Sequence, residues 1–257
     1  MRITTWNVNG LRAALKKGFG DCLAQLSPDV LLLQEIRSRP EQLPSLWQQP
    51  VGWQVHWRPA EKGGYAGTAI WSRRPLEILE TGWDGEPDLD GRILRARVGE
   101  LELVCVYLPS GSASPERQEI KEAWMARFLP WTRQWVQSDR PVLMGGDLNI
   151  ARTPRDIYYA KSNANKSGFL PHERAWFEEL LDGGWTDFVR LHYGDVDGPY
   201  TWWSNRGEAR EKDRGWRIDY LLGNPAAHRL WTDAHVYRPG GLTVSDHAPV
   251  TVNLRHP

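Results

Sequence analysis

The sequence has few cysteines and no long hydrophobic run, and both absences limit what the protein can be. Cys22 and Cys105 are the only cysteines among 257 residues, which excludes a disulfide scaffold and a cysteine-rich metal site. Both lie in apolar stretches, so we expect two buried thiols in a reducing compartment. No segment reaches the roughly 18 consecutive apolar residues of a membrane-spanning helix. These features predict a soluble cytoplasmic protein with no membrane partner.

An excess of charge of one sign is also lacking. The 32 lysines and arginines balance the 32 aspartates and glutamates, so the formal net charge is zero. Bulk charge therefore cannot attract nucleic acid, and any site for a polyanion must be a local basic patch.

Length and composition indicate one large folded domain. The chain could hold two small domains or one α/β domain with a sizeable core. No linker, repeat or charge block divides it, so we expect a single domain over residues 1–257. A heptad pattern is absent, which predicts a monomer.

Segments with strand and helix patterns alternate in both halves of the chain. Ile120, Ala123, Trp124 and Phe128 recur at helical spacing within residues 114–138, a predicted helix that Pro130 ends or kinks. Further helices are expected at residues 171–182 and between the first two strands. The order predicts an α/β fold, a four-layer sandwich of two mostly antiparallel sheets packed face to face with helices outside. Strands are expected at residues 2–8, 30–33, 53–57, 68–71, 94–98, 101–107, 141–144, 200–203, 217–222, 234–237 and 249–254.

Polar side chains stand at the ends of several predicted strands. Each one alone is most simply a turn cap or a hydrogen-bonded edge residue. Together they indicate a functional site. They are Asn7, Asn9, Gln34, Glu35, Asp147, Asn149, Asp219, Asp246 and His247.

Glu35 comes just after a run of four apolar residues, where an unpaired carboxylate would be costly. A hard divalent cation would neutralise it. Asn7, Asp147, Asn149 and Asp246 offer further oxygen ligands, and an all-oxygen set suits Mg²⁺ or Mn²⁺ rather than Zn²⁺.

His247 and Tyr107 are candidates for contact with a phosphate. A carboxylate such as Asp219 could hold one ring nitrogen of His247, so that the other binds a phosphate oxygen or takes a proton. The alternative is a capped loop histidine. The Tyr107 hydroxyl could bond the same phosphate, or the ring could simply pack at the sheet edge.

Seven short segments follow one another along nearly the whole chain: WNVNGLR at 6–12, LQE at 33–35, YLP at 107–109, GDLNI at 146–150, SGFLP at 167–171, WRIDY at 216–220 and SDHAP at 245–249. In content and order they resemble the exonuclease III-type apurinic/apyrimidinic (AP) endonucleases of the endonuclease/exonuclease/phosphatase superfamily. This resemblance implies a DNA-repair enzyme that hydrolyses the phosphodiester 5′ to an abasic site in duplex DNA.

The resemblance also implies cofactor, partner and residue roles. The cofactor is Mg²⁺, with Mn²⁺ possible, and the partner is double-stranded DNA with abasic sites or blocked 3′ ends, which would bring the protein to the nucleoid. Activity as a 3′-phosphodiesterase, 3′-phosphatase and 3′-to-5′ exonuclease is also implied. Whether Asp147 or the His247–Asp219 pair is the base stays open. The implied catalytic residues are Tyr107, Asp147, Asn149, Asp219 and His247, and the implied metal ligands are Asn7, Glu35, Asp147, Asn149, Asp246 and His247.

Residues 200–207 and Trp216 are similar to the part of these enzymes that holds a flipped abasic sugar. A sugar without its base is small and apolar on one face, so a wall of Trp202 and Trp216 near Ile218 suits it. Core packing is the alternative for these tryptophans. The DNA-binding residues expected from the same likeness and from their charge are Arg12, Lys17, Gly64, Tyr65, Arg92, Asn163 and Arg206.

Other functions remain open at this stage. Another phosphodiesterase of the superfamily would keep the catalytic set but not the pattern of residues 200–216. A 3′-end-trimming exonuclease without endonuclease activity would share all the phosphate chemistry. A non-cleaving module that binds damaged DNA would need no catalytic set, and here that set is complete.

Overall fold

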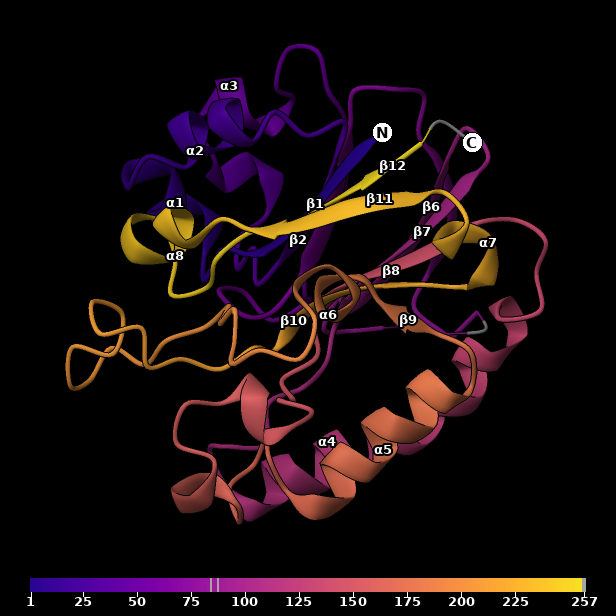
Figure 1. The fold of residues 1–257 in the computed structure, drawn as a ribbon. Helices are drawn as coiled ribbons and strands as arrows, with labels where there is room; N and C mark the ends of the chain where they lie inside the picture. The colour runs from indigo at the N-terminus through magenta and orange to yellow at the C-terminus, as the bar shows by residue number, and fades with distance from the viewer. Residues whose placement is uncertain (84, 87, 256–257) are drawn as a thin grey trace.

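The structure, a computed structural model, describes residues 1–83, 85–86 and 88–255. Two six-stranded sheets lie face to face, and only β1–β2 and β7–β8 are parallel neighbours among the described strands. The predicted four-layer sandwich is confirmed (Figure 1). The first sheet has the order β11 (Trp231–Val236), β12 (Val250–Leu254), β1 (Arg2–Asn7), β2 (Val30–Gln34), β4 (Thr68–Ser72) and β3 (Gln54–Arg58). The second has the order β5 (Glu77–Thr81), β6 (Ile93–Val98), β7 (Leu101–Tyr107), β8 (Val142–Asp147), β10 (Asp219–Gly223) and β9 (Thr186–Asp187).

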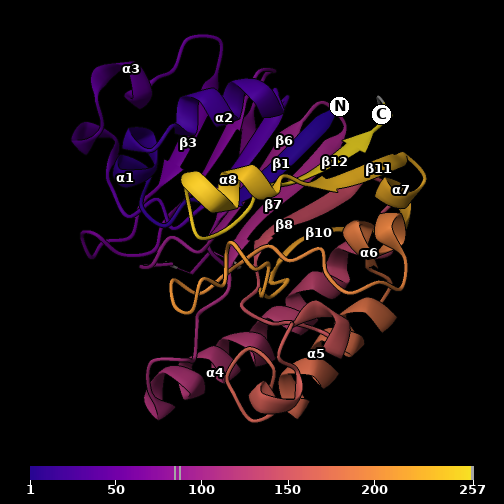
Figure 2. The same cartoon turned by 60° about the vertical axis from the view of Figure 1, so that its left-hand side comes forward.

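Helices cover the outer faces of both sheets, as Figure 2 shows. The first sheet carries α1 (Leu11–Lys16), α2 (Phe19–Leu26), α3 (Ser45–Gln48) and α8 (Arg238–Thr243), and the second carries α4 (Pro115–Thr132) and α5 (Pro171–Asp182). The short helices α6 (Phe188–Tyr193) and α7 (Pro225–His228) contact β11 and β10, respectively. Among the described helices, none is long and apolar enough to cross a membrane.

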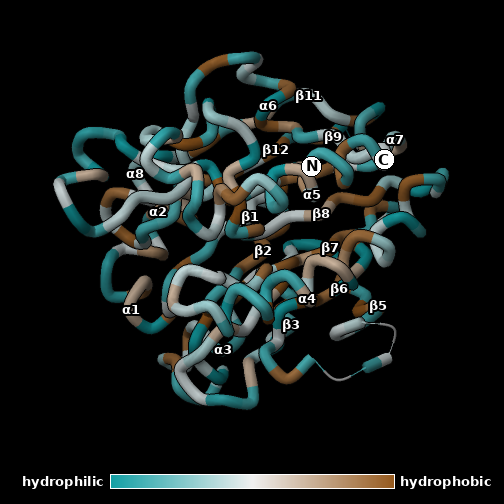
Figure 3. Tube along the Cα trace, turned by 90° about the horizontal axis from the view of Figure 1, so that it is seen from below, coloured by the Kyte–Doolittle hydropathy of each residue, from teal (hydrophilic) through white to brown (hydrophobic). Residues whose placement is uncertain are grey.

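The central strands are apolar on both faces because each lies between two layers. In β2, Leu32 packs toward the other sheet, whereas Leu31 and Leu33 join the cluster under α1 and α2. Full burial of such side chains contributes roughly 1.5–3 kcal/mol each. Figure 3 shows the hydrophobic colour concentrated along these strands and hydrophilic colour in the outer loops.

The register of the central strands gathers polar side chains at one edge of the sandwich. Asn7 ends β1 beside Gln34 at the end of β2, and Tyr107 ends β7 beside Asp147 at the end of β8. Asp219, the first residue of β10, is paired with Asp147 across the antiparallel ladder. The carboxyl ends of the two parallel pairs thus build the site.

Several expected elements differ from the structure. Residues 200–203 form no strand, because Trp202 makes only isolated bridges to Trp216 and His247. β5 follows from no pattern noted in the sequence. The expected first helix is two helices, since Gly18 between them takes a left-handed φ of 93°. Pro130 does not end α4, which continues to Thr132.

Candidate active site

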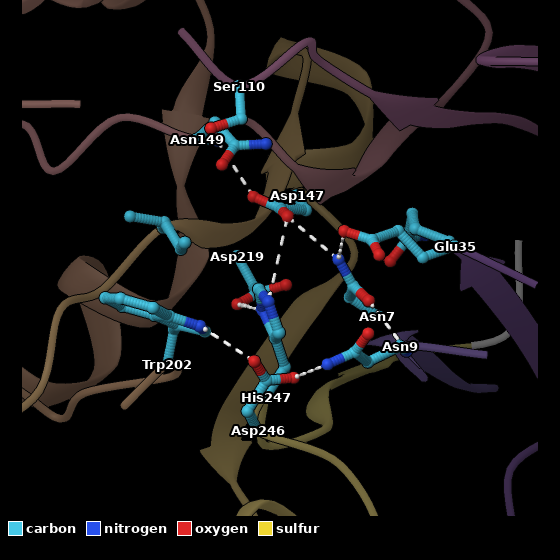
Figure 4. Close-up of polar contacts among 12 residues, drawn as sticks. Asn7, Asn9, Glu35, Ser110, Asp147, Asn149, Trp202, Asp219, Asp246 and His247 are labelled. Atoms are coloured by element: carbon cyan, nitrogen blue, oxygen red, sulfur yellow. Dashed lines mark hydrogen bonds and ion pairs between the residues drawn. The ribbon is translucent and has the colours of Figure 1, made fainter. Parts of the chain in front are cut away.

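Asp147 lies at the centre of the polar edge and is 1% exposed. Its carboxylate accepts hydrogen bonds from Asn7 Nδ2 at 2.9 Å and from the Asn149 backbone amide at 2.8 Å. Asn7 Nδ2 also donates to Glu35 Oε1 at 3.1 Å, so one amide joins two carboxylates (Figure 4). Ser245 Oγ donates to the Asn7 carbonyl at 2.8 Å and holds that strand end in place.

His247 faces the same carboxylate from the segment that precedes β12. Its Nδ1 is 2.9 Å from Asp219 Oδ2, and its Nε2 is 3.9 Å from Asp147 Oδ2. Burial alone would lower the pKa of His247, but Asp219, Asp147 and Asp246 outweigh burial and raise it well above the ordinary value. The ring is therefore an imidazolium in the metal-free protein, with Nδ1–H donating to Asp219. In this state Nε2–H can donate to a phosphate oxygen, whereas the expected role as a metal ligand requires the ring to lose that proton.

Tyr107 and Arg37 both contact the Glu35 carboxylate. The Tyr107 hydroxyl donates a short hydrogen bond to Glu35 Oε1, and the Arg37 guanidinium forms a close ion pair with Oε2. Burial, together with the charges of Glu35 and Asp147, raises the pKa of Tyr107 well above its ordinary value. Tyr107 therefore stays a neutral phenol and a hydrogen-bond donor at physiological pH.

Asp246 lies on the other side of His247. Its two oxygens accept from Asn9 Nδ2 at 2.8 Å and from Trp202 Nε1 at 3.2 Å. Burial would raise the pKa of Asp246, but His247 and these two donors hold it below the ordinary value. Asp246 is thus ionised, and it fixes the Trp202 ring at the mouth of the site.

The site carries more buried negative than positive charge. Asp147, Asp219 and His247 bring ligand atoms within 4.8 Å of one another. Burial and the neighbouring Asp219 carboxylate raise the pKa of Asp147 far above its ordinary value. Asp219 Oδ1 is buried and has no hydrogen-bond partner among the described residues. The cluster is therefore short of positive charge.

These residues fit a hard divalent cation. The donors are carboxylate and amide oxygens, and the buried negative charge is what such a cation neutralises. Of the expected ligands, Asn7, Glu35 and Asp147 are joined directly through the Asn7 amide, and Asp246 is reached through Asn9, whose backbone amide donates to Asn7 Oδ1 at 3.0 Å. Asn149 gives its side-chain amide to the Leu108 carbonyl at 2.8 Å.

A cavity of about 780 Å³ opens directly in front of these polar groups. Trp202, Trp216 and Ile218 line it together with Asp147 and His247. The two indole rings stand almost perpendicular, at 83°, with centroids 6.0 Å apart. Reciprocal backbone hydrogen bonds of 2.9 and 2.8 Å join the two tryptophans. The expected apolar wall and the catalytic groups thus share one cavity.

The residues expected to bind DNA divide into three sets. Arg12, Lys17, Gly64 and Arg206 are exposed, while Tyr65 and Asn163 are partly buried. Arg12 and Gly64 border a second cavity of about 800 Å³ beside the first. Arg92 differs from the expectation of a surface cation.

Arg92 is only 5% exposed, because its guanidinium is used inside the protein. It donates to the Tyr65 hydroxyl at 2.8 Å, to Asp90 at 2.9 Å and to the Tyr107 carbonyl at 3.2 Å. Arg92 therefore holds Tyr65 and the end of β7 in place rather than adding charge to the surface.

Sequence reasoning missed three charged residues that shape the site. They are Arg37 on Glu35, and Lys121 with Glu173 beneath the cavity. A lysine four residues before Met125 and seven before Phe128, on the buried face of α4, was the available signal for Lys121. No local pattern marks the other two.

Comparisons with known proteins agree with this geometry. The model of the endonuclease/exonuclease/phosphatase family matches residues 4–247. An exodeoxyribonuclease of Bacillus subtilis is 34% identical over 252 residues, covering 97% of this chain and 98% of that protein. The chain therefore belongs to the endonuclease/exonuclease/phosphatase family and is a phosphodiester-cleaving enzyme.

Comparison with solved structures shows which enzymes of this family the chain is similar to. The 3′-5′ exonuclease NExo from Neisseria meningitidis is similar with a TM-score of 0.91 and 32% identity over 100% of both chains. An AP endonuclease from Archaeoglobus fulgidus is similar with a TM-score of 0.90 and 26% sequence identity over 99% of both chains. A further NExo structure is that of a 3′ phosphatase bound to a product DNA hairpin. Within its family, the chain is thus a nuclease of the exonuclease III type, the type that includes the AP endonucleases.

Proposed function

We propose that the protein hydrolyses the phosphodiester 5′ to an abasic site in duplex DNA, with Mg²⁺ as the cofactor. The observation that carries this proposal is the cavity itself. It places Trp202, Trp216 and Ile218 beside Asp147 and His247, so a base-free sugar on the indoles would bring its 5′ phosphate to the polar groups.

The residues divide the reaction between them. Asp147 orients a water and takes its proton, while Asn149 holds the same water. The water oxygen attacks phosphorus and the bond to the 3′-oxygen breaks, leaving a 3′-hydroxyl and a 5′-deoxyribose phosphate. The His247 imidazolium, held by Asp219, donates to a non-bridging phosphate oxygen, where negative charge builds up. The Tyr107 phenol has a single proton, so it donates to the same phosphate by releasing its hydrogen bond to Glu35.

Glu35 and Asn7 would hold the cation, with Asp147 and Asp246 as the further candidate ligands. When bound, Mg²⁺ supplies charge neutralisation for the phosphate and the leaving oxygen. Without it, Arg37 supplies the positive charge at Glu35.

A second function is supported by the relatives. NExo is named a 3′-5′ exonuclease and a 3′ phosphatase, and its fold matches this chain throughout. Trimming of 3′ ends uses the same phosphate chemistry, so the same residues would remove 3′ nucleotides or 3′ phosphates. The two functions differ in how much they need the apolar wall.

The test is cleavage of a labelled duplex with one tetrahydrofuran abasic analogue, compared with the intact duplex, in Mg²⁺ and in EDTA. The analogue cannot undergo β-elimination, so a nick must be hydrolytic. We expect a Mg²⁺-dependent nick 5′ to the analogue while the intact duplex is spared. Loss of 3′ nucleotides without a nick would leave only the second function, and tight binding without any cleavage would contradict both.

Trp216→Ala tests the wall. We expect abasic cleavage to fall about ten-fold more than removal of a 3′-terminal nucleotide, since the apolar face of the base-free sugar loses its contact with the indole, and burial contributes about 0.8 kcal/mol per CH₂ group. Trp231→Ala, on the outer strand β11, is the control and should change neither rate. Equal losses on both substrates would remove Trp216 from the pocket.

A further inference from the structure

A fully buried ion pair joins α4 and α5 beneath the cavity. Lys121 Nζ lies 2.6 Å from Glu173 Oε1, and both side chains are 0% exposed. Two charges so far from water persist only when hydrogen bonds satisfy the remaining donors and acceptors. The partners that satisfy this pair are parts of the active site.

Lys121 also donates to the carbonyl of Asn149 at 2.9 Å. Asn149 takes a left-handed φ of 51°, and its backbone amide donates to Asp147 Oδ1. The ammonium therefore holds the backbone turn that sets both the Asn149 side chain and the Asp147 carboxylate. These two residues serve every phosphate cleavage that we propose.

Glu173 holds the opposite part of the cavity. Its Oε2 accepts from the backbone amides of Gly168 at 2.6 Å and Leu170 at 3.0 Å, and Oε1 accepts from Gln118 Nε2 at 3.1 Å. Gly168 and Leu170 line the cavity beside Trp216. Counting Lys121, the carboxylate has four partners and so fixes residues 168–170 firmly.

Residues 168–170 are packed tightly behind Trp216. A Cβ on Gly168 would stand 3.0 Å from the Trp216 ring and 3.1 Å from the Asn149 carbonyl. Gly168 also accepts from the Ala151 amide at 2.8 Å. A shift of residues 168–170 would therefore move Trp216, the surface on which the abasic sugar is expected to lie.

We propose that Lys121 and Glu173 are positioning residues with separable effects. Lys121 positions the backbone turn at Asn149, here called the catalytic turn, for all substrates. Glu173 positions residues 168–170, and through them the Trp216 wall, for abasic sites. This inference rests on the proposed function. A 3′-terminal nucleotide depends on the catalytic turn alone, whereas an internal abasic site depends on both the turn and the wall. Loss of Glu173 should thus change specificity, and loss of Lys121 should change rate.

The experiment compares Glu173→Ala, Glu173→Gln and Lys121→Met with the wild type on two substrates. One is the tetrahydrofuran duplex and the other a duplex with a recessed 3′ end. The ratio of the two kcat/KM values is taken on a single preparation, so the fraction of folded protein cancels. Glu80→Gln, which breaks the half-buried pair with Arg95 on β5 and β6, is the matched control.

Glu173→Ala also takes the counter-charge from Lys121, so kcat should fall on both substrates. We expect the abasic-to-3′-end ratio to fall about ten-fold in addition, mainly through KM on the abasic duplex. Glu173→Gln keeps an oxygen that accepts from Gly168 and should restore part of the ratio. Lys121→Met should lower kcat on both substrates by a similar factor and leave the ratio near that of wild type. Glu80→Gln should change neither ratio nor kcat.

A binding measurement gives a readout independent of turnover. In EDTA, fluorescence anisotropy should show that Glu173→Ala loses the preference for tetrahydrofuran over intact duplex while Lys121→Met keeps it. An unchanged ratio and preference in both Glu173 variants would overturn the inference. A wild-type protein that trims 3′ ends but does not cut the tetrahydrofuran duplex would overturn the proposed function first, before any variant is compared.

Discussion

Two buried clusters of charge flank the start of β10, and they are built in opposite ways. Two residues before the strand, Arg217 pairs with Asp156 at 2.7 Å and with Asp187 at 2.8 Å, while Arg190 also pairs with Asp156. Positive and negative charges balance there. On the other side, Asp219 belongs to the catalytic cluster. There the buried carboxylates of Asp147, Asp219 and Glu35 and the half-buried Asp246 face His247 and, at the rim, Arg37.

The difference shows in the pKa values of the two central aspartates. Burial would raise the pKa of Asp156, but Arg217 and Arg190 outweigh it and hold the value at about 2. The pKa of Asp147 moves the other way, because burial and the Asp219 carboxylate act together. Asp156 thus has its counter-charges within its own cluster, whereas the charge of Asp147 would be relieved by a proton or a cation.

Asp147→Asn should show the largest effect and separate the two clusters. We expect cleavage to fall by roughly 10³-fold or more, because a carboxylate that takes a proton and orients water is lost. Binding of tetrahydrofuran duplex should stay near normal. The measurement is single-turnover cleavage together with anisotropy, and lost binding with intact cleavage per bound complex would contradict the assigned role.

The same variant should not be less stable. A group whose folded pKa is raised contributes stability below its unfolded pKa and loses it as pH rises through the folded pKa. At pH 8 in EDTA the Asp147 charge therefore opposes folding, and Asn removes it. Thermal unfolding should show a Tm equal to or above that of wild type. A marked fall in Tm would mean that Asp147 is part of a stabilising cluster like that of Asp156.

Arg217→Met should give the opposite outcome. It leaves Asp156 and Asp187 buried without their shared cation, and breaking a buried pair from one side costs about 3–5 kcal/mol. Urea unfolding measures this loss. The cleavage rate per folded molecule should fall by much less than in Asp147→Asn. A stable variant that cannot cleave would place Arg217 in the catalytic cluster instead.

Asp156→Asn adds a pH dependence. The ordinary pKa near 3.9 falls to about 2 in the folded protein, which corresponds to roughly 2.5 kcal/mol of stability at neutral pH. Because the folded value is lowered, this stability is complete above about pH 5 and is lost as pH falls toward 2. The difference in unfolding free energy between wild type and variant should shrink over that range. A difference that is constant with pH would assign the loss to packing rather than charge.

The sequence made much of this comparison predictable on the catalytic side and little of it on the other. Strand-end residues such as Asn7 and Asp147 are visible because polar side chains end apolar runs, and parallel strands bring their carboxyl ends together. The seven ordered segments then indicated the family, and the order of strand and helix patterns indicated the four-layer fold. The balanced cluster has no such signature, since Asp156 lies 61 residues from Arg217, at the end of a single 3₁₀ turn (Pro154–Asp156).

Helix α4 shows why the rest stayed hidden. Ile120 belongs to the helical spacing that predicted this helix, but its side chain is 49% exposed, whereas its neighbour Lys121 is fully buried. The helix turned this face inward because Glu173 and the Asn149 carbonyl, from other segments, provide partners for the ammonium. A buried charge is decided by its partner across the fold, which periodicity within one segment does not contain.

Glu35→Gln should have the smallest effect and tests the claim that the catalytic cluster lacks positive charge. It removes one negative charge from the expected cation site but keeps the oxygen that accepts from Tyr107 and Asn7. We expect the Mg²⁺ concentration for half-maximal cleavage to rise about ten-fold, or about 1.4 kcal/mol. The rise of Tm with added Mg²⁺, which wild type should show, should weaken in parallel.

The control is Glu102→Gln on β7, whose carboxylate pairs with Arg95 and Arg97 of β6, away from the catalytic cluster. A titration unchanged in Glu35→Gln, in both cleavage and Tm, would take Glu35 out of the ligand set and leave its charge to Arg37 alone.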